Sequence, residues 1–68
     1  MENTLIKVGG MSCEGCVKNV TGVLTALPGV ASAEVSLAAG EAKVVYDAQA
    51  VSRAVLLAAI EDAGFDAA

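Results

Sequence analysis

Hydrophobic and polar residues follow either a period of two or a helical spacing along most of this 68-residue chain. The first such segment, Thr4–Val8, is short, apolar and rich in β-branched residues, which is typical of a strand with Ile6 and Val8 directed inward. Gly9 and Gly10 follow directly, and paired glycines favour a turn. The pattern therefore predicts a strand that leads into a loop.

A helix is predicted from about Glu14 to Leu27. Apolar residues recur there at helical spacing, and polar residues occupy the opposite side. Pro28 and Gly29 end the helix, because proline cannot continue it and glycine suits the turn that follows. The residues expected on its buried side are Val17, Val20, Leu24 and Leu27.

Two alternating segments, Val30–Leu37 and Glu41–Asp47, predict an antiparallel pair of strands. Residues 38–40, Ala-Ala-Gly, provide the hairpin turn between them. In the first strand the residues expected to face the core are Ala31, Ala33, Val35 and Leu37. In the second strand they are Ala42, Val44 and Tyr46.

A second helix is expected after Ser52, which suits the N-cap position, with Val51 and Leu56 placed to form a hydrophobic staple. Gly64 is expected to end this helix, and residues 65–68 leave room for a short last strand. The buried stripe of the helix is expected to contain Leu56, Ala59, Ile60 and Ala63.

The predicted order is strand, helix, strand, strand, helix, strand. This βαββαβ order indicates an α+β, ferredoxin-like sandwich in which two helices cover one face of a four-stranded antiparallel sheet. Residues 1–68 are too few for more than one domain. Hydrophobic residues make up 56% of the chain, but they include only one Phe, one Tyr and no Trp. The core is therefore expected to consist of small and branched side chains.

Composition narrows the function classes. The net charge of −4 and the scarcity of aromatic residues argue against nucleic acid as a partner, since phosphate binding needs clustered Lys and Arg. No segment reaches the roughly 20 apolar residues that span a bilayer, and no signal peptide is evident, so we expect a cytoplasmic protein without membrane insertion.

The chemistry is concentrated in the only two cysteines, Cys13 and Cys16, at the predicted start of the first helix. Their spacing is too short for a stabilising crosslink, so a functional pair in a reducing compartment is indicated. A helix N-terminus favours thiolates, which either bind soft metals or attack disulfides. The Ser12 hydroxyl is expected to cap the helix.

Closed zinc coordination is improbable, because it usually takes four Cys or His ligands and the chain contains no His. Two thiolates alone favour Cu(I), which tolerates two-coordinate binding. Such open coordination also admits a third thiolate from another protein, so the metal can be passed on without being released.

Three motifs resemble the heavy-metal-associated domain family: the loop Gly10-Met11-Ser12-Cys13 with Cys16, the turn Leu27-Pro28-Gly29-Val30, and Ala63-Gly64-Phe65. The resemblance spans nearly the whole chain and implies that Cys13 and Cys16 bind Cu(I). It implies that Met11 packs beneath the loop without binding metal and that Phe65 lies close to the metal. Ser12 stands where members that bind divalent metals often carry Asp, which favours a monovalent soft ion.

Among family members, the chain looks most like a small bacterial cytosolic copper chaperone. We therefore expect a Cu(I) carrier, not an enzyme, that delivers copper to a copper-transporting P-type ATPase or a copper-responsive regulator by thiolate exchange. Cys13 is expected to engage the partner first and Cys16 second, with Lys18 as a partner contact. The protein is expected to be a monomer without metal, and a metal-bridged dimer is a second expected state.

Three alternatives share the same thiol pair. The chain could be the N-terminal metal-binding domain of a copper-transporting ATPase, as Phe65 suggests, although Met1 and the compact ending favour a free-standing protein. A Hg(II)-binding protein would use the same linear dithiolate preference. A thiol–disulfide oxidoreductase is also open, but the thioredoxin-like context is absent, with no Trp before the motif and no Pro inside it.

Overall fold

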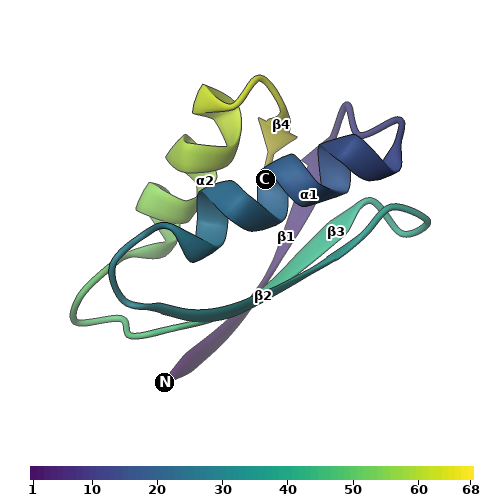
Figure 1. Cartoon of the computed structure of the whole chain (residues 1–68). Helices are drawn as coiled ribbons and strands as arrows, with labels where there is room; N and C mark the ends of the chain where they lie inside the picture. Colours follow the sequence, from purple (N-terminus) through teal and green to yellow (C-terminus); the bar gives the residue numbers. More distant parts are fainter.

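A computed structural model describes residues 1–68 and shows two helices packed on one face of a sheet (Figure 1). All strand pairs are antiparallel, and the strand order is β2-β3-β1-β4. This is the predicted ferredoxin-like βαββαβ arrangement. The elements are β1 (Glu2–Gly9), α1 (Glu14–Thr25), β2 (Val30–Ser36), β3 (Glu41–Tyr46), α2 (Arg53–Asp62) and β4 (Asp66–Ala67).

The core lies between the helices and the sheet and contains no polar or charged residue other than Tyr46, whose side chain is 8% exposed. The expected inward residues of β1 and β3 are buried, and so are the central residues of both helix stripes. Small and branched side chains fill this space, as the composition indicated. The ten core residues are Ile6, Val8, Val20, Leu24, Ala42, Val44, Tyr46, Val51, Leu56 and Ile60.

The inward face of β2 differs from the prediction at both ends. A β-bulge between Val30 and Ser32 leaves Ala31 without a partner in β3 and turns Val30 toward the core. Ala31 is therefore exposed, and Val30, Ala33 and Val35 pack against the core instead. Leu37 lies beyond the strand in the hairpin turn and is 38% exposed, so its predicted burial was also wrong.

Helix ends follow the expected signals with small shifts. Ser52 caps α2 by accepting a hydrogen bond from the Val55 backbone N–H at 3.4 Å. Ala63 is the C-cap residue of α2 and is exposed, so its predicted place in the buried stripe was wrong. The first helix, α1, ends at Thr25, two residues before the predicted Leu27.

Neither helix combines the length and the hydrophobicity that crossing a membrane requires.

Gly29, in the turn after α1, is the glycine that the packing requires most. Its φ is +93°, and a Cβ there would lie 2.7 Å from the Ala50 Cβ in the loop before α2. Gly22 lies inside α1, and a Cβ there would meet no atom within 4 Å. The two positions therefore predict opposite effects of adding one methyl group.

We predict that Gly29→Ala lowers the free energy of unfolding by about 2–4 kcal/mol, from the left-handed backbone and the overpacking combined. Gly22→Ala, the matched control, should raise it by about 0.5–1 kcal/mol, because alanine costs less entropy than glycine inside a helix. Urea unfolding of the metal-free protein checks both values. Equal effects of the two substitutions would contradict the packing described for the turn.

Candidate metal centre

The two cysteines lie at the junction of β1 and α1, which are joined by a loop after Gly9 (Figure 1). Gly10 has a φ of +89°, which lets the loop turn sharply. Cys13 is the N-cap residue of α1, with extended backbone angles, and its carbonyl accepts from the Cys16 N–H at 3.1 Å. The backbone of both cysteines is therefore tied to the first turn of the helix.

The sulfur atoms of Cys13 and Cys16 lie 3.3 Å apart. This separation exceeds the length of a disulfide bond, which is about 2 Å, and both residues are free cysteines. Cys13 is exposed and Cys16 is partly buried. No third Cys, His, Asp or Glu lies close enough to form a larger ligand group with them.

Hydrogen bonds lower the pKa of the Cys16 thiol below its ordinary value. The largest contribution is a hydrogen bond from the backbone of Ser12, followed by one from the Cys13 side chain. Partial burial of the thiol opposes them by a smaller amount. The thiolate of Cys16, the form that binds soft metals, is therefore favoured by the loop itself.

Ser12 has a different place from the one predicted. The helix begins at Glu14, so Cys13 occupies the N-cap, and no side chain caps α1. Ser12 instead lies one residue outside, where hydrogen bonding from its backbone and, to a smaller extent, its hydroxyl lowers the pKa of the Cys16 thiol. The predicted helix start, about Glu14, is correct, and the error is the assignment of the N-cap to Ser12 instead of Cys13, which directly precedes the helix.

The charged residues beside the thiols contribute little to the site. Glu14 and Lys18 are exposed, and neither is in an ion pair, since the one ion pair of the structure joins Lys7 and Glu41. Neither residue is a cause of the lowered pKa of Cys16. Lys18 is accessible on α1, as a partner contact must be.

Met11 lies in the loop between β1 and α1, and Phe65 lies between α2 and β4. Both are partly buried and pack against the core. A Cβ on Gly10 would lie 3.8 Å from Phe65 Cδ1, so the ring lies against the turn that leads to the cysteines.

One support of the site was not foreseen from the sequence. The Val8 N–H donates to the Gly40 carbonyl at 2.8 Å, which ties the β2–β3 hairpin to the end of β1 just before the loop. Gly40 has a φ of +64°. The glycine at the hairpin turn was the one feature of the sequence that could have indicated this contact.

Comparison with known proteins gives a consistent picture. A family model for the heavy-metal-associated domain matches residues 5–66. A Haemophilus influenzae protein of uncharacterised function is 48% identical, covering 98% of this chain and 97% of its own length. Human copper-transporting ATPase 2 is 47% identical over 94% of this chain, which spans only 4% of that ATPase.

Among solved structures, the CopZ metallochaperone superposes with a TM-score of 0.95 at 37% identity. The superposition covers 98% of this chain and 100% of that one. The chain is thus similar both to a small whole protein and to one segment of a much larger ATPase.

We predict that one thiol of the metal-free protein ionises below the ordinary range of cysteine and that this thiol is Cys16. Because its folded-state pKa is lowered, the accompanying stabilisation is present at alkaline pH and is lost as the pH falls through that lowered value. Thiolate absorbance followed against pH should show an early step, an ionisation below the ordinary range of cysteine, in the wild type. The same step should appear in Cys13→Ser, where the Ser12 hydrogen bond remains. Cys16→Ser should lose it, and an early step that survives in Cys16→Ser would contradict the assignment.

Proposed function

Because the chain belongs to the heavy-metal-associated domain family, we propose that it binds one Cu(I) ion through Cys13 and Cys16 and passes that ion to another protein. Domains of this family are metal-binding modules, and their relatives include copper chaperones and segments of copper-transporting ATPases. The observation that carries the proposal is the pair of adjacent, accessible sulfurs with no further ligand beside them.

The ligand set favours a soft monovalent ion. Two thiolates satisfy Cu(I), whereas Zn(II) usually takes four ligands and Ca(II) or Mg(II) prefer oxygen. Glu14 lies between the cysteines but does not form a ligand group with them. Ser12 adds no carboxylate at the position before Cys13.

Linear binding requires a small movement of the sulfurs. Metal–sulfur bonds of about 2.3 Å would place two sulfurs up to about 4.6 Å apart in a linear arrangement, compared with 3.3 Å between them here. Exposed Cys13 is the residue that can rotate, because Cys16 is held by hydrogen bonds and by its place in α1. The metal therefore forms a firm bond to Cys16 and an adjustable one to Cys13.

This asymmetry supports an order of transfer. A partner thiolate first reaches the metal on the exposed side, where it displaces Cys13, and Cys16 is displaced last. Each step exchanges one metal–sulfur bond for another, so the ion is never free. The recipient of this cytoplasmic chaperone is a copper-transporting ATPase domain or a copper-responsive regulator, which contacts α1 near Lys18.

A second candidate keeps the same chemistry within a larger protein. The 47% identity to a segment of human copper-transporting ATPase 2 favours it, and the domain would then receive copper on behalf of the transporter. The similarity to the CopZ metallochaperone over its entire length supports the chaperone. Hg(II) would bind the same two sulfurs. Measuring the relative affinities of the protein for Hg(II) and Cu(I) distinguishes the two ions.

Thiol–disulfide exchange fits the site less well. A dithiol catalyst needs its activated thiolate accessible to the disulfide that it attacks. Here the thiol with the lowered pKa is Cys16, the more buried of the two. The arrangement favours holding a metal over attacking a substrate disulfide.

We predict that Cys13→Ser and Cys16→Ser each weaken Cu(I) binding by more than about a hundredfold, since even loss of an outer-shell partner can weaken a metal site that far. A competition titration against a strong Cu(I) chelator measures this effect. Asn19→Ala, an exposed change on the next turn of α1, is the control and should bind as the wild type does. Near-normal binding by either serine variant would refute the two-sulfur site.

We also predict that copper transfer to a partner slows as ionic strength rises. The net charge of −4 favours a partner face that is neutral or basic, and salt shortens the attraction to a basic face to a range of about 10 Å at 0.1 M. Stopped-flow measurement of transfer to an ATPase metal-binding domain at several salt concentrations checks this. A rate that is independent of salt would remove electrostatic guidance from the account.

A further inference from the structure

Gly15 lies between the two cysteines, as the second residue of α1, and it is exposed. Its backbone is helical and does not require glycine, because the glycines with a positive φ are Gly10, Gly29, Gly40 and Gly64. A side chain at position 15 is therefore compatible with the fold. What such a side chain would change is the surroundings of one sulfur atom.

A Cβ on Gly15 would lie 3.7 Å from the Cys13 sulfur. The Cβ atoms of a helix tilt toward its N-terminus, so a side chain at position 15 leans back toward the N-cap residue, Cys13. At this distance the two atoms would be in ordinary van der Waals contact, and neither would have to move. The absence of a methyl group at Gly15 thus leaves one side of the exposed Cys13 sulfur uncovered.

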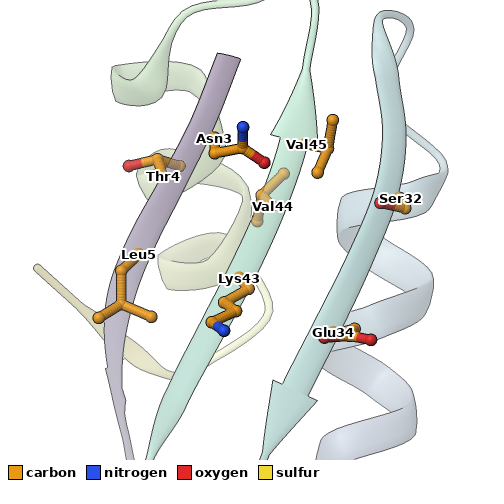
Figure 2. A pocket seen from close by; sticks show the side chains of 8 residues that line it. All are labelled: Asn3, Thr4, Leu5, Ser32, Glu34, Lys43, Val44 and Val45. Atoms are coloured by element: carbon orange, nitrogen blue, oxygen red, sulfur yellow. The ribbon is translucent and has the colours of Figure 1, made fainter. Parts of the chain in front are cut away.

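The exposed side of α1 is also the side proposed to meet a partner. Lys18 follows Gly15 by three residues, so the two lie on the same side of the helix, and both are exposed. This surface is separate from the outer face of the sheet, which Figure 2 shows with Leu5, Lys43 and Glu34 and with the helices behind the strands. A partner that contacts Lys18 therefore also comes close to Gly15.

We infer that Gly15 keeps the Cys13 sulfur open to large incoming thiols and thereby sets the rate at which a bound metal is exchanged. The part that concerns copper rests on the proposed function. In the exchange, a partner thiolate bonds to Cu(I) while the bond from Cu(I) to Cys13 breaks. Cys13 leaves as a thiolate and takes up the proton that the partner thiol has lost, and copper keeps its charge.

Crowding at Cys13 should act on this exchange more than on the bound state. The bound ion needs only the two sulfurs of the chain, whereas the exchange brings a third sulfur, with its protein, beside Cys13. A methyl group at position 15 would contact the Cys13 sulfur without displacing it. It would, however, occupy space that the incoming group needs.

The first test measures access to the sulfur without metal. In reduced protein carrying Cys16→Ser, Cys13 is the only thiol. Its alkylation rates with N-ethylmaleimide and with the larger N-pyrenylmaleimide are compared at one pH, so that the fraction of thiolate cancels from their ratio. Relative to the small reagent, the large one should react about threefold more slowly in Gly15→Ala and about tenfold more slowly in Gly15→Val, because each added methyl group crowds the approach.

The second test follows copper in the chain with both cysteines. Stopped-flow transfer of Cu(I) to an ATPase metal-binding domain should be about threefold slower from Gly15→Ala and about tenfold slower from Gly15→Val. In competition with a Cu(I) chelator, Gly15→Ala should bind as tightly as the wild type. A general disturbance of the loop would instead weaken binding together with transfer.

Gly22 provides the matched control, because it is exposed on the same helix and a Cβ there would meet no atom within 4 Å. Gly22→Ala and Gly22→Val should keep the alkylation ratio and the transfer rate of the wild type.

The inference is overturned if Gly15→Val leaves the alkylation ratio unchanged, or if the Gly22 variants change it equally. It is also overturned if Gly15→Ala transfers copper at the wild-type rate, or if its affinity falls as much as its rate. A wild-type chain that transfers no copper would contradict the proposed function, and the alkylation ratio would still decide whether Gly15 controls access to Cys13.

Discussion

Hydrogen bonds at the junction of β1 and α1 hold two sulfur atoms side by side, and the rest of the fold keeps that junction in place. The Cys13 carbonyl accepts from the first turn of the helix, and hydrogen bonding from the Ser12 backbone lowers the pKa of the Cys16 thiol. Behind them, Val8 is tied to the hairpin through Gly40, and Met11 and Phe65 pack against the core. The chain thus combines a fixed sulfur, Cys16, with an accessible one, Cys13.

Much of the architecture could be predicted because the inward positions that alternation assigns to β1 (Ile6 and Val8) and to β3 (Ala42, Val44 and Tyr46) are all buried. Val30 and Ala31 show where such reasoning ends. Both are small and apolar, so the pattern gives no reason to place a bulge between them, and only pairing with β3 decides which of them faces the core. Ala63 failed for a related reason, since alanine is equally compatible with a buried stripe and an exposed C-cap.

The cysteine pair was evident from its spacing, but the causes of its reactivity were not. The helix N-terminus was the expected source of thiolate stabilisation, whereas the structure adds specific hydrogen bonds from Ser12 and Cys13 to Cys16. α1 begins at Glu14 as predicted, but its N-cap is Cys13 and not Ser12. The contact of Arg53 with Thr4 joins residues far apart in the sequence, and no local pattern announces it.

The central claim is that two sulfurs alone hold one Cu(I) ion in an open coordination that another thiolate can enter. Copper X-ray absorption of the protein loaded with one equivalent of Cu(I), free of small thiols, tests this most directly. The account predicts a copper ion with two sulfur neighbours and no nitrogen or oxygen ligand. A first shell containing nitrogen or oxygen, or a closed set of four sulfurs, would contradict it.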